Sequence, residues 1–386
     1  MRIAIFTNNY LPNPYGVSNS IESFRQELEM MGHIVYVFAP AWENYVDTNP
    51  RVFRYPAIDI KFKFKFPLPI PYSRQIDAIL EKLDIDIIHS QHPNLLGSVA
   101  RRWAQKKNIP LVFTWHTLYD QYVHFIPFVP HKIAAWWAIR NARKYADKCD
   151  QIIVPTQSIV KIIQDWGVQN RNIVAIATGV EENEYANADR NFVRKKYGIG
   201  EKEILLLLVS RLTDEKNIQF LFNSVQEVLK NNSHIKFIVV GGGYLLPELQ
   251  KISLKQNLGK QVFFTGIISK EEIKNYYAAG DIFIHASKSE TQGMILTEAM
   301  FMGLPIVAVR ATGACDLVED NKTGFLVAEQ EQKFAQAVEK LISNKDLREK
   351  FSLQSVTIAR EKYTAQVCAK KMLEVYIKVI ERNKKE

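Results

Sequence analysis

The sequence predicts a doubly wound α/β protein with two domains, each built on a parallel β-sheet with helices on both faces. Three observations support this fold class: short apolar runs alternate with longer helical patterns, the runs are apolar throughout, and one polar stretch interrupts the series. Strands that are apolar on both sides are covered on both faces, as in parallel sheets with crossover helices. At 386 residues the chain is long enough for two domains of ordinary size.

The apolar runs set the expected order of strands. The predicted strands are 2–6, 35–39, 85–89, 110–114 and 151–155, followed by 203–210, 235–241, 261–266, 281–287 and 305–309. Between 177 and 192 the sequence turns polar and rich in Asn before the second series begins. We therefore expect domains over 1–177 and 178–363, with a last helix over 364–384 that packs back on the first domain. Ligands are expected at the carboxyl ends of the strands, in a cleft between the domains.

Composition places the protein among soluble globular chains, with 47% hydrophobic and 24% charged residues. No apolar run is long enough to cross a bilayer, and the opening "MRIAIF" reads as a strand rather than a signal peptide. A cytoplasmic location follows as an expectation. The cysteines Cys149, Cys315 and Cys368 fit neither a disulfide framework nor a zinc cluster, so we expect no bound metal.

Basic residues concentrate in the N-terminal half of a chain whose net charge is +9. The tract 100–148 holds nine Lys and Arg residues against Asp120 and Asp147, with "HFIPFVP" and the Trp136–Trp137 pair nearby. Cations mixed with aromatic residues are typical of a surface that contacts anionic lipid, although core tryptophans on an amphipathic helix would explain the pair nearly as well. No nucleic-acid partner is expected.

The segment "KFKFKFPLPIP" (61–71) alternates lysine with phenylalanine. In one strand this pattern would put the lysines on one face and the phenylalanines on the other. We interpret it as an edge strand whose lysines discourage aggregation, or as a loop that contacts a membrane.

Several glycines and histidines follow predicted strands of the first domain. Gly16 comes just before a helical pattern, where helix N–H groups would stabilise an anion, although a plain turn glycine is equally consistent. A G-x-G-x-x-G fingerprint is absent, which weakens a hydride-transfer function. His116 follows one strand, while His89 and His92 flank another and more often have core or surface roles.

In the second domain, Arg211 and Lys216 follow a buried strand and suit a diphosphate, with a solvated basic loop as the alternative. We expect Arg211 to be shielded from open solvent because it follows the apolar strand immediately. Gly241–Gly243 would allow close backbone approach to a ligand. Gly266 and Ile267 follow the next strand, where backbone groups would read a nucleobase, although simple strand-end turns explain these sites about as well.

Two glutamates stand out in "SKSETQGMILTEAMFMGLP" (287–305). Glu298 shares a helix face with Met294 and Met302, while Glu290 precedes the helix. An unpaired carboxylate in an apolar row is costly to bury, so Glu298 requires a partner. Sugar hydroxyls would supply it, with both carboxylates pointing into one cleft, and a buried arginine would do so equally well.

Taken together, "SETQGMILTEAMFMGLP", "SRLTDEKN", "GGGYLLPEL" and "YLPNPYGV" resemble the retaining glycosyltransferases of the two-glutamate family, whose two Rossmann-like domains form the GT-B architecture. The resemblance covers essentially the whole chain. The segment "HTLYDQYVHFIPFVP" (116–130) is similar to the acceptor-side segment of diacylglycerol glucosyltransferases. Many relatives have two glycines where this chain has Tyr15–Gly16.

The resemblance implies roles for individual residues. Glu290, His116, Arg211 and Lys216 would be catalytic, with His116 positioning the incoming hydroxyl rather than acting as a general base. The implied donor-binding residues are Gly16, Arg211, Lys216, Gly242, Gly266, Ile267, Glu290, Gln292, Gly293, Met294, Ile295 and Glu298. The implied acceptor-binding residues are His116, Thr117, Tyr119 and His124.

The implied activity is retaining, metal-independent transfer of a hexose, with glucose favoured, from a UDP-sugar to 1,2-diacylglycerol. The enzyme would associate peripherally with the cytoplasmic face of an anionic membrane and need no cofactor beyond the nucleotide sugar. The donor domain would be 178–363 and the acceptor domain 1–177. Alternatives are a transferase for a soluble or polyprenyl-linked acceptor, a nucleotide-sugar epimerase, and a non-catalytic nucleotide-binding module.

Overall fold

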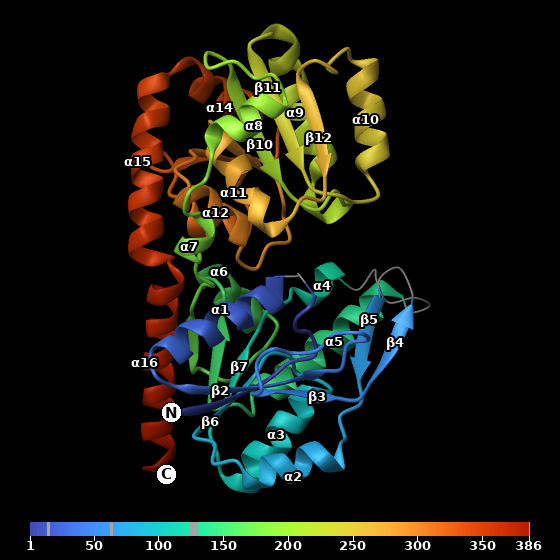
Figure 1. Ribbon diagram of the computed structural model, residues 1–386, viewed down its shortest axis with the longest axis vertical. Coiled ribbons are helices and arrows are strands. Elements are labelled where there is room, and N and C mark those ends of the chain that lie inside the picture. Colours follow the sequence, from blue (N-terminus) through green and yellow to red (C-terminus); the bar gives the residue numbers. More distant parts are fainter. Residues whose placement is uncertain (14–15, 62–64, 123–129, 386) are drawn as a thin grey trace. The chain divides into compact units, whose positions relative to one another are not determined.

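The structure is a computed structural model that describes residues 1–13, 16–61, 65–122 and 130–385. The chain divides into two compact units. Residues 1–179 and 365–386 form the N-terminal unit, and residues 180–364 form the C-terminal unit. Figure 1 labels the elements of both.

The N-terminal unit is built on a seven-stranded sheet in the order β3-β2-β1-β6-β7-β8-β9. Its strands are β1 (Arg2–Phe6), β2 (Ile34–Pro40), β3 (Val52–Tyr55), β6 (Ile87–Ser90), β7 (Leu111–Thr114), β8 (Gln151–Val154) and β9 (Ile173–Ala175). Every neighbouring pair is parallel. The helices of this unit are α1 (Gly16–Met30), α2 (Arg74–Lys82), α3 (Leu96–Lys107), α4 (Tyr119–Tyr122), α5 (His131–Ala146), α6 (Gln157–Asp165) and α16 (Ala365–Asn383).

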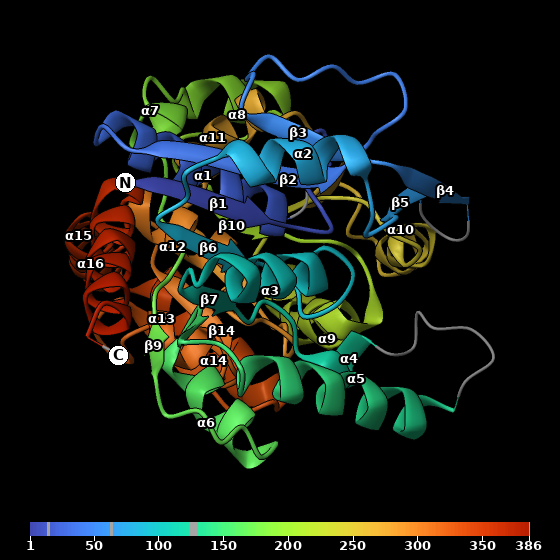
Figure 2. The ribbon, with the colours of Figure 1, turned by 90° about the horizontal axis from the view of Figure 1, so that it is seen from below.

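Both faces of this sheet are covered, which explains why its strands are apolar throughout. In β1, Ile3 and Ile5 pack with α1 and α16, while Ala4 and Phe6 pack with α2, α3, α5 and α6. The C-terminal helix α16 lies beside α1 (Figure 1) and is seen end-on in Figure 2. The last helix of the chain thus belongs to the N-terminal unit.

The lysine–phenylalanine segment does not form the single strand that its alternation predicts. β4 (Ala57–Lys61) and β5 (Lys65–Pro69) make a separate antiparallel pair in which Lys61 lies opposite Lys65. Of the segment 61–71, Lys61 ends β4 and residues 65–69 form β5, while residues 62–64 lie outside the described residues.

The C-terminal unit contains a six-stranded parallel sheet in the order β12-β11-β10-β13-β14-β15. Its strands are β10 (Ile204–Val209), β11 (Ile235–Val240), β12 (Val262–Gly266), β13 (Ile282–His285), β14 (Ile306–Val309) and β15 (Gly324–Val327). Its α-helices are α7 (Glu182–Tyr185), α8 (Arg190–Lys196), α9 (Ile218–Asn231), α10 (Leu246–Lys255), α11 (Lys270–Ala279), α12 (Met294–Phe301), α13 (Ala314–Leu317), α14 (Glu331–Ser343) and α15 (Lys345–Lys362). A 3-10 turn covers Asp214–Lys216.

This second sheet is also covered on both faces. Leu206 and Leu208 of β10 pack with α9, α10 and α14, while Leu205 and Leu207 pack with α8, α11, α12 and α15. Two doubly wound parallel sheets confirm the predicted fold class. In the described part of the chain, no helix combines the length and apolar character needed to span a bilayer.

The strand order reverses direction once in each sheet, between β1 and β6 and between β10 and β13. At such a switch point the connections leave toward opposite sides, which opens a crevice at the carboxyl ends of the two strands. Most of the predicted site residues follow these strands or their immediate neighbours.

Candidate active site

The switch point of the C-terminal sheet holds an ion pair between Lys216 and Glu290. Lys216 ends the 3-10 turn that follows β10, and Glu290 lies in the loop between β13 and α12. Lys216 Nζ is 2.6 Å from Glu290 Oε1, and both side chains are largely buried. Burial by itself would raise the pKa of Glu290, but the Lys216 ammonium outweighs it and holds that pKa below its usual range. The cation and the carboxylate therefore neutralise each other.

Arg211 lies at the end of the same strand but is not shielded as we expected. Its side chain is 43% exposed, and its guanidinium lies 3.3 Å from Glu215, four residues further along the chain. The expectation was wrong because the residue after an apolar strand already belongs to the surface loop. The guanidinium is therefore paired with a carboxylate and open to solvent on its other side.

His285, the last residue of β13, is a feature of this site that the sequence did not reveal. Its side chain is buried, and within the described residues its Nε2 atom has no hydrogen-bond partner. Burial lowers the pKa of His285 to about 4, with Glu290 opposing the shift and Lys216 adding to it. A neutral imidazole thus lies within electrostatic reach of the Lys216–Glu290 pair.

Glu298 has tyrosine partners rather than the buried arginine considered from sequence. Its Oε2 atom accepts a hydrogen bond of 2.6 Å from the Tyr277 hydroxyl, and Tyr185 also bonds to the carboxylate. Burial raises the pKa of Glu298 even though both tyrosine bonds lower it. Tyr277 lies on α11 and Tyr185 on α7, so three helices meet at this carboxylate.

Two of the glycines after β11 are required by packing inside the protein. A Cβ atom on Gly241 would lie 1.9 Å from the carbonyl oxygen of Ser210, and one on Gly243 would lie 2.2 Å from that of Leu212. These glycines let the β11–α10 loop approach the segment that carries Arg211. They support the site indirectly, whereas the sequence suggested close approach to a ligand.

The remaining predicted donor residues lie at neighbouring strand and helix ends. Gly242 faces the Ile267 side chain, and Gly266 ends β12 with a φ of +70°. Ile267 is almost fully exposed, which leaves the strand end open to a ligand. The segment leading into α12 contains the buried Gln292, followed by Gly293, which is the N-cap of the helix. Met294 and Ile295 lie in the first turn of α12.

The N-terminal unit places His116 just beyond β7, at the carboxyl edge of its sheet. His116 Nε2 is 2.6 Å from the side-chain oxygen of Gln91, which follows β6. The Thr117 carbonyl accepts a hydrogen bond of 2.9 Å from the Trp115 indole, and the Tyr119 ring packs edge-on against that indole. Gly16 is the first residue of α1. His124 lies outside the described residues.

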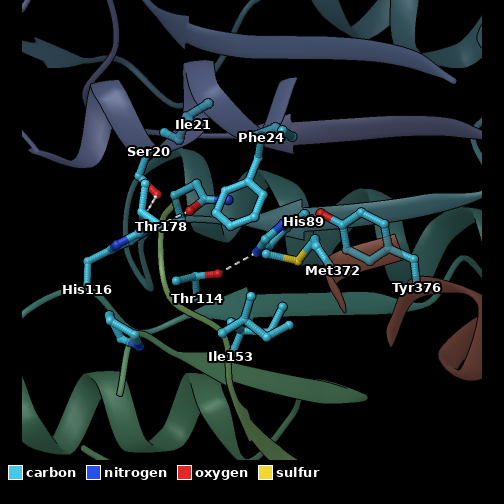
Figure 3. Close-up of a pocket in the computed structure, with 14 residues that line it drawn as sticks. Ser20, Ile21, Phe24, His89, Thr114, His116, Ile153, Thr178, Met372 and Tyr376 are labelled. Carbon is cyan, nitrogen blue, oxygen red and sulfur yellow. Dashed lines mark hydrogen bonds between the residues drawn. The ribbon is translucent and has the colours of Figure 1, made fainter. Parts of the chain in front are cut away.

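Three histidines, His89, His92 and His116, form a cluster at this edge. His89 is bonded on both ring nitrogens, to the Tyr376 hydroxyl of α16 and to Thr114 Oγ1, each at 2.6 Å. Burial lowers the pKa of His89 and His116 to about 3 and that of His92 to about 4. Figure 3 shows the narrow cavity that His89 and His116 line together with Thr114 and Tyr376. All three imidazoles are neutral at physiological pH, so His116 is suited to hydrogen bonding rather than to proton abstraction.

Among the described residues, no group of three or more His, Cys, Asp or Glu side chains is arranged to hold a metal ion. The titratable groups at both switch points bond instead to lysine, tyrosine, threonine or amide partners.

Comparison with known proteins agrees with this arrangement. Residues 189–355 match the family described as "Glycosyl transferases group 1", and residues 14–184 match "Glycosyltransferase Family 4". The chain is 30% identical to the alpha-monoglucosyldiacylglycerol synthase of Streptococcus pneumoniae, covering 99% of this chain and 87% of that protein. It is also 30% identical to the protein of that name from Acholeplasma laidlawii, covering 100% and 99%.

Among solved structures, Anabaena HepE in complex with UDP and glucose superimposes with a TM-score of 0.75 at 19% identity. The match covers 97% of this chain and 99% of HepE, and it shows the shared GT-B fold. Three findings agree: the similarity to the two synthases over most of each chain, the two family matches, and the two doubly wound sheets. The chain belongs to the GT-B glycosyltransferases of group 1.

Proposed function

We propose that the protein is a retaining hexosyltransferase that moves glucose from UDP-glucose to 1,2-diacylglycerol at an anionic membrane surface. The proposal assigns the donor to the C-terminal unit and the acceptor to the N-terminal unit. It requires no metal and no cofactor beyond the nucleotide sugar. Near full-length similarity to two proteins named alpha-monoglucosyldiacylglycerol synthase supports the sugar and the acceptor.

The charges of the C-terminal switch point suit the departure of a nucleoside diphosphate. When the bond between the anomeric carbon and the β-phosphate oxygen breaks, its electrons stay on that oxygen. Lys216 and Arg211 would stabilise this oxygen, because cations positioned where negative charge develops lower the barrier. Lys216 would then exchange part of its contact with Glu290 for phosphate, which frees the Glu290 carboxylate to accept hydrogen bonds from the hexose.

Retention follows if the acceptor attacks from the face that the diphosphate leaves. The diacylglycerol hydroxyl oxygen would bond to the anomeric carbon while its proton passes to the departing phosphate. His116 would hold this hydroxyl by a hydrogen bond, since its low pKa makes it a poor base. Glu298 would bind the donor ribose, with Tyr277 and Tyr185 keeping its carboxylate in place.

The observation that carries the lipid acceptor is the exposed face of α5. Ile133, Trp136 and Trp137 are 58%, 61% and 55% exposed, which argues against the alternative of core tryptophans. Arg140 lies over the Trp136 ring at 5.5 Å, and Lys144 is exposed one turn further along the helix. Large apolar side chains beside cations are typical of a helix that lies on an anionic bilayer. We therefore propose peripheral association with the cytoplasmic face of the membrane.

A transfer assay tests the proposal. Purified protein is incubated with radiolabelled nucleotide sugars and anionic vesicles that contain 1,2-diacylglycerol, and the lipid extract is analysed for glycolipid. We expect product from UDP-glucose, and almost none from the Glu290→Gln variant. Glu319, which is partly exposed and ion-paired with Lys322, offers a comparable change in the same unit, and Glu319→Gln should retain activity. Labelled lipid from another sugar only, transfer only to a soluble or polyprenyl acceptor, or conversion of the donor without acceptor would each overturn it.

A further inference from the structure

We propose that Gln91 is a positioning residue that fixes the tautomer of His116, so that Nε2 carries the proton and Nδ1 remains a hydrogen-bond acceptor. That the hydroxyl group hydrogen-bonded to Nδ1 belongs to the lipid acceptor rests on the proposed function. The tautomer itself does not, because it is a property of the free protein.

The Gln91 backbone is anchored to the sheet, and the residue is buried. Gln91 follows β6 directly, its backbone N–H donates to the Phe6 carbonyl at 2.9 Å, and only 5% of the residue is exposed. Its side-chain oxygen lies 2.6 Å from His116 Nε2. An amide oxygen only accepts hydrogen bonds, so Nε2 must be the donor.

The tautomer matters because His116 carries a single proton. Burial and the neighbouring His92 and His89 keep the imidazole neutral, which leaves one ring nitrogen protonated and the other with a free lone pair. Within the described residues, Nδ1 of His116 has no hydrogen-bond partner. Both His116 and Gln91 line the cavity of Figure 3, so the protein fixes one side of the ring and leaves the other for a ligand.

The consequence for transfer is directional. A hydroxyl that donates its proton to Nδ1 keeps its oxygen lone pairs free to attack the anomeric carbon. The opposite tautomer would present an N–H at Nδ1 and occupy a lone pair of the attacking oxygen. Gln91→Met removes the acceptor at nearly constant size, so neither ring nitrogen then has a protein partner among the described residues and the preference for the Nε2–H tautomer is lost. The variant is therefore expected to populate both tautomers.

Nitrogen-15 NMR of histidine-labelled protein measures the tautomer directly, with His116→Ala to assign the signal. The wild type should show a protonated Nε2 and an unprotonated Nδ1, whereas Gln91→Met should show shifts intermediate between those of the two tautomers. His92, whose Nδ1 accepts from the Asn8 N–H at 3.1 Å, should keep its tautomer in both proteins. Gln91→Glu retains an oxygen acceptor and should keep Nε2 protonated. Gln164→Met, an exposed glutamine on α6, is the matched control and should match the wild type.

Kinetics supply the second readout. In the lipid assay, Gln91→Met should lower kcat about twofold, because about half of the protein keeps the competent tautomer, while KM for the nucleotide sugar stays unchanged. A wild-type His116 with the proton on Nδ1 would overturn the inference, as would a Gln91→Met spectrum that shows no change. A wild type that transfers no glucose but has the expected tautomer would refute the proposed function and leave the role of Gln91 standing.

Discussion

Replacing Lys216 by Met tests whether the buried ion pair is as consequential as its geometry indicates. The substitution removes the cation 2.6 Å from Glu290 and leaves a largely buried carboxylate without its charge partner. Breaking such a pair from one side costs about 3 to 5 kcal/mol, and the slight exposure of both side chains places this case near 3 kcal/mol. For a unit of this size the midpoint of thermal unfolding should fall by roughly 6 to 12 °C.

Spectroscopy separates the two units in this experiment. All six tryptophans lie in the N-terminal unit, so their fluorescence should report an unchanged transition. Far-UV circular dichroism reports on both units, so it should show the C-terminal unit of Lys216→Met unfolding at a lower temperature than in the wild type. The matched control is Lys288→Met, which removes a lysine at 2.8 Å from Glu329 in an exposed pair and should cost less than about 1 kcal/mol.

Acidification gives an independent check on the cause. In the wild type the folded-state pKa of Glu290 is depressed, so its stabilisation is present above the unfolded pKa of about 4.3 and is lost as the pH falls through the folded value. Without Lys216, the effect of burial is opposed only by His285 and Ser287, so the folded-state pKa of Glu290 rises and the cost of burying its charge exists only above the unfolded pKa. The gap between wild type and Lys216→Met should therefore narrow below about pH 5. A Lys216→Met variant as stable as Lys288→Met at pH 7 would refute this reasoning.

Further predictions concern the tyrosine contact, the histidine cluster and the membrane face. Tyr277→Phe removes a hydrogen bond to Glu298 and should raise KM for the nucleotide sugar about tenfold, whereas Tyr276→Phe, whose hydroxyl meets Lys196 instead, should not. The folded-state pKa values of His89, His92 and His116 lie below the unfolded value of about 6.5. The stability of the folded N-terminal unit is therefore greatest above pH 6.5 and falls on acidification, by about 1.4 kcal/mol per pH unit for each histidine. Urea unfolding followed by tryptophan fluorescence from pH 7 to pH 5 measures this slope, and a flat profile would contradict it. Replacing both Trp136 and Trp137 by Ala should abolish flotation with anionic vesicles while leaving transfer to a detergent-dispersed acceptor intact; unchanged flotation would exclude α5 as the contact.

The central strands were predictable because their burial is uniform. β10 is apolar at nearly every position since helices cover both of its faces, and the same holds for β1. β3, β9 and β15 were not predicted because they are short edge strands with a weaker apolar signal. The pairing of β4 with β5 was not predicted, because β4 ends at the first residue of the lysine–phenylalanine segment and only β5 lies within it.

At the site, the sequence indicated which residues carry charge but not what each one contacts. The Lys216–Glu290 pair joins residues 74 positions apart, and the bond between Tyr277 and Glu298 crosses from one helix to another. Spacing within one helix contains no information on such contacts. His285 and Gln91 were not singled out because a histidine in an apolar strand and a glutamine after one are unremarkable until their neighbours are known.

The anomeric configuration of the product tests the account most directly. Protein, UDP-glucose and 1,2-diacylglycerol vesicles are incubated, and the glycolipid is purified. Proton NMR then measures the coupling constant of its anomeric proton. The account predicts α-glucosyl diacylglycerol, formed by the wild type and lost in Glu290→Gln. A β-linked product, or glucosyl lipid formed equally well without the Glu290 carboxylate, would contradict it.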